Sequence, residues 1–526
     1  MAPFLSTIFC LLVLRVFIPR ASAYHWPDPQ IEYADKVLYG DSFLSIFPIN
    51  CTPRDNTTIA AQWIRIAYHD MATHNVDDGT GGLDASIAFE LDRAENIGSG
   101  MLASINDFLP FTSPVAGLAD LIAMGTVIGA AACRGPIVPY RAGRVDAISA
   151  GPPGVPEPQQ DLASHTESFR RQGFTESEMI GLVACGHTTG GVRRKDFPEI
   201  IHDSSVDLAT FDSTTAFDNS VVVEYLDGTT NNPLVVGPNA TTNSDLRIFS
   251  SDGNVTMQSI ASPQDFSKTC SSLLERMINT VPKGVGLSEV VEPIEYKVSE
   301  AMLYPNSEDG FTLTTNLRIL STNPKRTVSM FWNDRKGSVC GASGCSVQPQ
   351  SSREATLTYL TNMRGINGGT NYLFNATVNI TSSISRFWFE VDENDGSAPV
   401  IVDNGGTGFE IDQDAVLLDM GRTRRVFNFD GELENSLFKL RLIVAVRGDE
   451  TSQVSVTTYI PSDDPIGFLP TIQTIQLRPD PQYPPTAGFT YFSVNATDRV
   501  TFFDVHGTVG AKTFKQVFID TDSIVF

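Results

Sequence analysis

The chain is 526 residues long, more than one hydrophobic core usually organises, so we expect at least two domains. It carries 37 basic and 61 acidic side chains, a formal net charge of −24. A surface of that sign repels nucleic acid and anionic membranes, so we expect neither as a partner.

The first 23 residues are typical of a secretory signal peptide. An apolar run from Phe4 to Ile18 ends in Ala21-Ser-Ala23, the small-residue pattern of a cleavage site. An uncleaved anchor is the alternative, but Arg15 interrupts the run, which is short for a bilayer span. No later stretch has the length and apolarity of a span, so we expect a secreted, extracellular protein.

Sequons and cysteines fit the same destination. Six Asn-x-Thr sequons predict a glycoprotein: Asn56, Asn239, Asn254, Asn375, Asn379 and Asn495. Asn50-Cys-Thr52 also fits the pattern, but a bridged Cys51 would make it a poor acceptor. Cys10 leaves with the signal, and the remaining cysteines are even in number, as disulfides in an oxidising compartment require. Cys340 and Cys345 flank a loop of small residues and could close a local bridge.

The first half of the chain has helical patterns. Apolar side chains recur at helical spacing from Ile59 to Met71. The stretch 118–132 is rich in Ala and apolar almost all round, as in a central buried helix. Asp120 within it therefore needs a buried partner.

Two further helices follow a connector rich in Pro and Gly. The pattern over 161–172 predicts a helix that Gly173 ends. Thr175 and Glu178 form a capping box that starts the next helix. His187 lies at helical spacing from the apolar stripe of that helix, so we expect it to face whatever the stripe covers.

From about residue 290 the chain changes to short β-rich runs separated by Gly, Asn, Asp and Pro. The clearest runs are 312–319, 326–332, 386–391 and 438–446. They carry no cluster of His, Cys or carboxylates at catalytic spacing. We therefore expect an all-β, sandwich-like domain over 291–526, after an N-terminal domain over 24–290.

Two stretches of the N-terminal domain carry chemistry. In 63–70, Arg65 and His69 are four residues apart, so a helix places a fixed cation beside an imidazole. In 184–190, His187 stands near the end of another helix. We interpret the two stretches as opposite walls of a haem pocket.

Both stretches resemble motifs of the plant, fungal and bacterial haem peroxidase superfamily, nearest to its secreted fungal members. Its distal motif, Arg-x-x-aromatic-His-Asp, is matched by Arg65, Tyr68, His69 and Asp70, and its Gly-His-Thr-x-Gly run by 186–190. The resemblance covers about residues 50–290. It implies an all-α haem peroxidase domain that holds haem b, reduces hydrogen peroxide and oxidises a small, phenol-like organic electron donor.

The resemblance assigns the distal roles. Breaking the O–O bond of a peroxide needs a base to move a proton and a cation to stabilise developing charge. His69 and Arg65 would supply them, and Asn96 would hold His69 in place. An ordinary Asn at a helix end is the alternative for Asn96.

On the proximal side the resemblance makes His187 the axial iron ligand. Such an imidazole needs a carboxylate partner to raise its basicity. The run from Arg247 to Asp252 is similar to the family's Arg-apolar-x-Ser-Asp pattern with one extra residue, so Asp252 is our choice. Asp245 is the fallback, and either could be a plain surface acid.

Two calcium sites follow from the same resemblance, because oxygen-rich loops with carboxylates suit a hard cation. The distal set is Asp70, Gly82 through its carbonyl, Asp84 and Ser86. The proximal set is Thr188, Asp212, Thr214 and Asp218. The proximal loop is one residue short of the fungal pattern, which leaves its carbonyl ligand, Ala216 or another, open. Without the resemblance both loops would be read as polar turns.

The resemblance also pairs Cys51 with Cys133. By parity Cys185 and Cys270 would form a further disulfide, although Cys185 could instead be a buried thiol beside the ligand helix.

Tyr68 departs from the family pattern, which places Phe or Trp there. It could form the pocket wall alone, hydrogen-bond peroxide, or carry a radical.

Other departures concern the electron donor. Manganese-oxidising relatives have carboxylates where this chain has Thr58, Gln62 and Arg193, and lignin-oxidising relatives have a surface Trp where it has Leu182. We therefore expect donor oxidation at the exposed haem edge near Pro139, which favours small phenols.

Two other functions stay open. The chain could be a catalytically weak glycoprotein whose β domain is a binding or adhesion module. His69, Asp70 and His74 could instead hold a non-haem metal ion.

Overall fold

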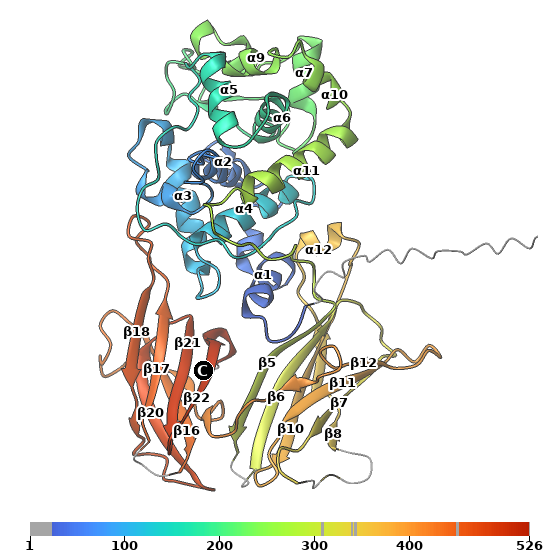
Figure 1. Ribbon diagram of the computed structural model, residues 1–526, viewed down its shortest axis with the longest axis vertical. Coiled ribbons are helices and arrows are strands. Elements are labelled where there is room, and N and C mark those ends of the chain that lie inside the picture. The colour runs from blue at the N-terminus through green and yellow to red at the C-terminus, as the bar shows by residue number, and fades with distance from the viewer. Residues whose placement is uncertain are drawn as a thin grey trace, which may run out of the picture.

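The computed structural model of the chain describes residues 24–40, 42–306, 310–337, 340, 345–448 and 452–524. The predicted signal peptide, residues 1–23, lies outside the described residues. Helices form the first half and antiparallel sheets the second, as predicted (Figure 1). Among the described helices, none combines the length and the apolarity that crossing a membrane demands.

Eleven α-helices make up the N-terminal part, counted over its described residues. They are α1 (Pro29–Tyr39), α2 (Ile59–Met71), α3 (Ser99–Phe108), α4 (Leu118–Ala132), α5 (Leu162–Arg171), α6 (Glu176–Gly186), α7 (Ser220–Asp227), α8 (Pro233–Val236), α9 (Ser244–Phe249), α10 (Val255–Ser259) and α11 (Pro263–Asn279). Two small sheets accompany them: β1 (Pro53–Arg54) with β2 (Thr57–Thr58), and β3 (Gly191–Arg193) with β4 (Leu208–Thr210).

The central helix is α4, and every one of its residues is buried, as its composition predicts. Asp120 has the expected partner, because the Arg144 guanidinium donates to its carboxylate at 2.9 Å. Helix α2 packs against α4 so closely that a side-chain carbon at Gly129 would lie 3.2 Å from the Cα of Ala60. This close approach positions α2, which carries the distal motif.

Local capping sets where the functional helices begin. The Thr58 side chain accepts the amide of Ala61 at the start of α2. Helix α6 begins with the predicted capping box between Thr175 and Glu178. Three disulfides also form, and all three pairings agree with prediction: Cys51–Cys133, Cys185–Cys270 and Cys340–Cys345.

The β region contains two sandwiches, where the sequence predicted one sandwich-like domain. In the first, the sheet β5-β6-β10-β9 packs on β12-β11-β7-β8, with β13 beside β11. Its strands are β5 (Tyr296–Pro305), β6 (Gly310–Ile319), β7 (Thr327–Asn333), β8 (Cys345–Val347), β9 (Ser351–Glu354), β10 (Thr370–Asn379), β11 (Arg386–Asp392), β12 (Val400–Val402) and β13 (Phe409–Glu410).

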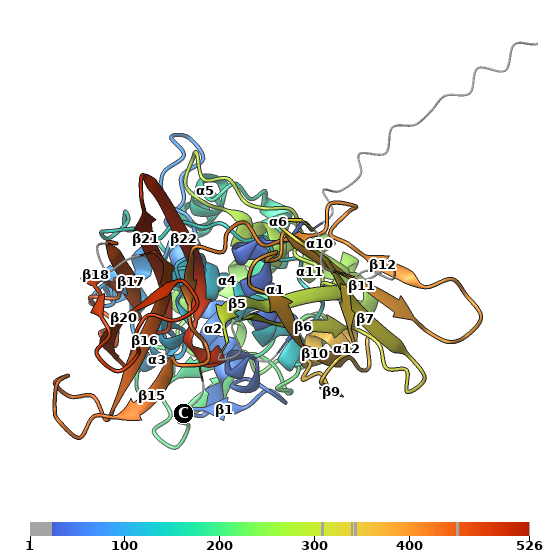
Figure 2. The ribbon, with the colours of Figure 1, turned by 90° about the horizontal axis from the view of Figure 1, so that it is seen from below.

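The second sandwich packs the sheet β14-β16-β20-β19, with β15 beside β16, on β18-β17-β21-β22. Its strands are β14 (Val416–Leu418), β15 (Arg424–Phe427), β16 (Phe438–Arg447), β17 (Val454–Ile460), β18 (Thr471–Gln476), β19 (Arg478–Pro479), β20 (Phe489–Thr497), β21 (Phe502–Val509) and β22 (Lys512–Asp520). Seen from below, the two sandwiches lie side by side under the helices (Figure 2).

Strand β16 joins the two sandwiches. Leu442 and Val444 face the core of the second sandwich, whereas Ile443 and Ala445 belong to the core of the first. A strand buried on both faces needs an uninterrupted apolar run, which is what 442–446 provides.

The β region is locked to the helices by a buried ion cluster. Asp35 of α1 lies 2.8 Å from both Lys297 of β5 and Arg318 of β6. Burial alone would raise the pKa of Asp35, but the two cations outweigh it and hold that pKa below its usual value. A short helix of the first sandwich, α12 (Tyr359–Met363), adds a further contact, because the Tyr359 hydroxyl donates to Ile128 O.

We predict that Asp35→Asn lowers the free energy of unfolding of the full chain by about 3–5 kcal/mol, because it leaves two buried cations without their anion. Urea denaturation followed by circular dichroism measures the loss. Asp520→Asn is the control, since it removes a more exposed partner of Lys36 and should cost about 1 kcal/mol or less. Equal losses in the two variants would contradict the role given to Asp35.

Candidate active site

A cavity of about 600 Å³ lies between α2 and the C-terminal end of α6. Arg65, Tyr68 and His69 line it from α2, and Leu182 and His187 line it from the α6 side. The two stretches that the sequence singled out therefore face one cavity. A volume of this size is within the usual range for a cofactor site.

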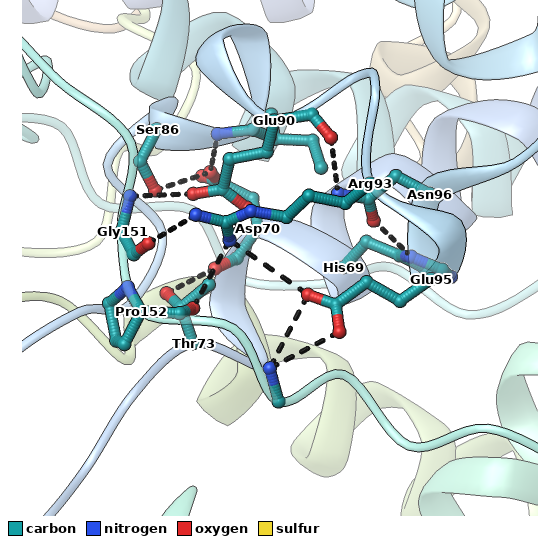
Figure 3. Close-up of polar contacts among 12 residues, drawn as sticks. His69, Asp70, Thr73, Ser86, Glu90, Arg93, Glu95, Asn96, Gly151 and Pro152 are labelled. Atoms are coloured by element: carbon teal, nitrogen blue, oxygen red, sulfur yellow. Dashed lines mark hydrogen bonds and ion pairs between the residues drawn. The ribbon is translucent and has the colours of Figure 1, made fainter.

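The distal imidazole is held in one tautomer. Asn96 Nδ2 donates to the carbonyl of Glu90 at 3.0 Å, so its Oδ1 is the atom that faces His69 Nδ1 at 2.9 Å (Figure 3). An amide oxygen can only accept, so Nδ1 of His69 carries the proton and Nε2 keeps its lone pair. The predicted pairing of Asn96 with His69 is thus present, and Nε2 is available as a base.

The electrostatics favour the same state. Burial and the neighbouring Arg65 cation lower the pKa of His69 to about 3, against the opposing effect of the Asn96 hydrogen bond. Burial also lowers the pKa of Arg65, to about 10, which still leaves the guanidinium charged at neutral pH. Arg65 Nη2 donates to Ile97 O at 2.9 Å. A neutral base and a cation therefore lie side by side.

The proximal imidazole pairs with Asp245, so our first choice of Asp252 was wrong and the fallback is correct. His187 Nδ1 lies 2.9 Å from Asp245 Oδ2, which also accepts Asn232 Nδ2 at 2.8 Å. Asp245 is 1% exposed and lies in the first turn of α9. The proton of His187 is therefore on Nδ1, and Nε2 can ligate a metal.

Asp252 has a structural role instead. Helix α9 ends at Phe249, and Asp252 lies beyond that end, beside α10. There its carboxylate accepts the amide and the hydroxyl of Thr256, at 2.8 and 2.6 Å.

Phe211 is a site residue that sequence reasoning missed. Its ring is parallel to the imidazole of His187, with centroids 4.1 Å apart and planes 12° apart. It directly follows strand β4, and no local pattern relates it to a histidine 24 positions earlier. Only the pairing of β3 with β4 brings Phe211 back to the end of α6, so predicting this contact would have required predicting that strand pair.

The lining of the cavity fits haem, which is a planar apolar group with two carboxylates at one edge. Phe169, Leu182 and Phe211 supply apolar walls. Among the described residues, the Arg and Lys side chains that line the cavity are Arg65 and Arg193. His187 Nε2 would hold the iron of a haem, and the positive charge of Arg193 would favour its carboxylates.

The residues at the manganese positions do not form a metal site. Thr58 is buried and hydrogen-bonds to Thr189 O, and Gln62 accepts from Arg54. Arg193 forms ion pairs with Asp196 and Asp55. The guanidinium of Arg193 therefore occupies the space between the Asp196 and Asp55 carboxylates.

Two positions considered for oxidation of the electron donor, Pro139 and Leu182, do not offer an exposed site at the cavity edge. Pro139 is not at the cavity, because 138–142 packs along 288–291, where Val291 N donates to Tyr140 O. The prolines that line the cavity are Pro156 and Pro158. Leu182 is 3% exposed, so that position does not reach the surface.

Tyr68 forms part of the cavity wall. Its ring stacks on Phe169, with centroids 5.9 Å apart. Burial raises the pKa of its phenol, and Gln172 is the side chain that opposes this shift. The phenol is therefore neutral, and its buried hydroxyl has no hydrogen-bond partner among the described residues.

Of the distal calcium set, Asp84 and Ser86 contact Asp70, and Figure 3 shows Ser86 beside it, whereas the Gly82 amide donates to Thr73 Oγ1. The Asp70 carboxylate accepts the amides of Asp84, Ala85 and Ile87 at 2.7–2.9 Å, and the Ser86 hydroxyl at 3.5 Å. Burial, with Asp84 nearby, raises the pKa of Asp70. The loop is thus held by hydrogen bonds to a carboxylate whose oxygens are already well supplied with donors.

The proximal set fits a cation better. Thr188 Oγ1 donates to Asp218 O at 2.6 Å, and Thr214 Oγ1 lies 3.2 Å from Asp218 Oδ2 and 3.4 Å from Ala216 O. Asp212 Oδ2 is buried without a hydrogen-bond partner. Burial, together with Asp218 and Glu224, raises the pKa of Asp212 to about 7. An unpaired carboxylate oxygen among other oxygens is what a hard cation would satisfy.

The alternative non-haem site is not assembled. His74 Nδ1 hydrogen-bonds to Gly81 O, and His69 Nδ1 to Asn96. Across the part of the chain that the structure describes, the group of His, Cys and acidic side chains close enough to share an ion is Asp334, Cys340 and Cys345. Its two cysteines form a disulfide.

Comparison with known proteins agrees with this geometry. Residues 49–262 match the peroxidase family. A WSC domain-containing protein of Arthroderma benhamiae is 35% identical over 396 residues, which is 71% of this chain and 54% of that protein. This similarity is longer than the family match, so it continues beyond the peroxidase segment.

Plant and yeast enzymes match the helical part. Putative L-ascorbate peroxidase 6 of Arabidopsis thaliana is 36% identical over 136 residues, 25% of this chain and 41% of that protein. The mitochondrial cytochrome c peroxidase of Yarrowia lipolytica is 27% identical over 169 residues, 31% and 46% of the two chains. The chain thus spans about half the length of these curated relatives. Residues 49–262 are therefore a segment of the peroxidase family.

Proposed function

We propose that the chain is a secreted haem peroxidase that reduces hydrogen peroxide and oxidises small, phenol-like donors in one-electron steps. The observation that carries the proposal is the pair of imidazoles that line one cavity, each held by a partner at Nδ1, which leaves both Nε2 atoms free. The three disulfides support an oxidising compartment and so fit secretion.

The distal residues would carry the proton transfer. His69 Nε2 takes a proton from one oxygen of the peroxide and delivers it to the other oxygen, which leaves as water. Arg65 stabilises the negative charge that develops on the departing oxygen. Bound haem would supply two electrons to the peroxide and would regain one electron from each of two donor molecules.

The proximal residues would hold and tune the cofactor. His187 would bind the haem iron through Nε2, while Asp245 accepts a hydrogen bond from its Nδ1 and makes the imidazole more basic. Phe211 keeps the ring orientation by stacking on it.

The charge of the lining bears on the donor. Glu95, Glu157 and Glu199 line the cavity in addition to the paired Asp196. These carboxylates repel an anionic donor and tolerate a neutral one, which supports neutral phenols.

The firmest test separates the two histidines. His69→Ala should slow the peroxide-induced shift of the Soret band by about 10²–10⁴-fold with haem still bound, because only the base is lost. His187→Ala should instead lower the haem content of the purified protein. His202→Ala, an exposed histidine outside the cavity, is the control. A wild-type chain that binds haem and ignores peroxide would refute the proposal.

The pH dependence follows from the lowered pKa of His69. Proton transfer needs neutral His69, so its rate should stay constant from pH 8 to about pH 5 and fall as the pH approaches 3. Arg65→Leu removes a cation that lowers this pKa, so the fall should begin at higher pH, at a lower overall rate. Stopped-flow measurement across pH tests both. A wild-type midpoint near pH 6.5, the value of an ordinary imidazole, would contradict the assignment.

Calcium belongs to the proposal through the proximal loop. Calcium should raise the melting temperature of the wild-type chain and chelation should lower it, because the ion pairs with the otherwise unsatisfied Asp212 carboxylate. In Asp212→Asn the proximal part of this response should be lost. Asp203→Asn, an exposed neighbour bonded to Ser205, should respond as wild type does. An identical calcium response in both variants would exclude the site.

A further inference from the structure

The hairpin between β17 and β18 extends from the second sandwich into the helical core. In Figure 1 its tip rises to the helical part beside α3. Phe468, in the loop 461–470, is 1% exposed and belongs to the same apolar cluster as α2 and α4. Its ring contacts Phe89, with centroids 5.2 Å apart and planes 54° apart.

The loop at the tip of this hairpin has a defined shape. The Ser462 hydroxyl lies within hydrogen-bond distance of the carbonyls of Asp464 and Gly467, and the amide of Ile466 donates to the Asp464 carboxylate. A loop held by its own hydrogen bonds presents Phe468 in one position.

Phe89 directly precedes Glu90, the residue whose carbonyl holds Asn96. It ends the short 3₁₀ helix Ser86–Phe89, and the following carbonyl, that of Glu90, accepts Asn96 Nδ2. Asn96 in turn holds His69 (Figure 3). Only one peptide unit therefore separates the contact with the β region from the hydrogen bonds that orient the distal base.

Polar contacts with Asp70 and Gly151 also hold the segment 86–96 in place. Asp70 accepts the amides of Ala85 and Ile87, and the Glu90 carboxylate accepts the amide of Gly151 (Figure 3). Within this segment the Phe89 ring contacts Phe468. The β region thus completes the packing of the segment that carries Asn96.

We propose that Phe468 is a positioning residue for the distal site. By packing on Phe89 it fixes the Glu90 carbonyl, and thereby the Asn96–His69 hydrogen bond and the direction of His69 Nε2. The inference rests on the proposed function, because it concerns the base of that reaction. It gives the second sandwich a part in peroxide reduction.

A second aromatic contact between the same two regions offers a matched control. Phe502 of β21 is buried and packs on Tyr33 of α1, with centroids 5.9 Å apart. Among the described residues, neither of the two forms a hydrogen bond or a ring contact with the 86–96 segment. Loss of Phe502 should therefore weaken the interface without displacing Asn96.

The test uses the full chain with haem bound and compares Phe468→Ala with Phe502→Ala. Phe468→Ala should lower the rate constant for peroxide by about tenfold or more, since small displacements of a base are costly, with haem content and donor KM unchanged. Phe502→Ala should stay within about twofold of wild type. Phe468→Leu, which keeps an apolar side chain, should recover most of the rate.

Two further measurements separate positioning from packing alone. In an Asn96→Ala background, Phe468→Ala should have little additional effect, because both changes act on the same hydrogen bond. Amide hydrogen exchange over 86–97 should rise in Phe468→Ala and not in Phe502→Ala, whether or not the protein reduces peroxide. A wild-type chain inert to peroxide would overturn the proposed function alone. Unchanged exchange over 86–97, or fully additive rates with Asn96→Ala, would overturn the role of Phe468.

Discussion

A neutral imidazole offers a lone pair at only one of its two nitrogens, and the hydrogen-bond partner of the other nitrogen decides which one. This constraint organises the helical half of the molecule. On the distal side the partner is a neutral amide, Asn96, which orients His69, while burial and Arg65 keep this imidazole weakly basic. On the proximal side it is a buried carboxylate, Asp245, which strengthens His187 as an electron-pair donor. Two chemically different partners thus give two different roles to the same side chain.

Much of this could be read from the sequence because it is local. Helix α4 has the predicted bounds, the capping box of α6 is present, and Arg65 and His69 lie on one helix as their spacing requires. Each of these depends on residues within a few positions of one another, where periodicity and capping chemistry determine the structure.

The errors arose where distant segments meet. Asp245 and Asp252 are seven residues apart and look alike in sequence, but the short helix α9 turns only the first toward His187. Phe211 reaches His187 through the pairing of two three-residue strands, which no pattern announces. In the β region the strands were visible, but their division into two sandwiches depends on long-range pairing and on a shared strand, β16.

The buried cluster of Asp35, Lys297 and Arg318 has a consequence for how such a chain can change over evolutionary time. Its anion lies in the first helix, and its cations lie in the first two strands of the β region. Loss of Asp35 would leave two buried cations without their anion, and loss of either cation would remove one of the two partners of a fully buried carboxylate. The helical and β parts are therefore coupled in descent as well as in space, and they would be inherited and diversify as one unit.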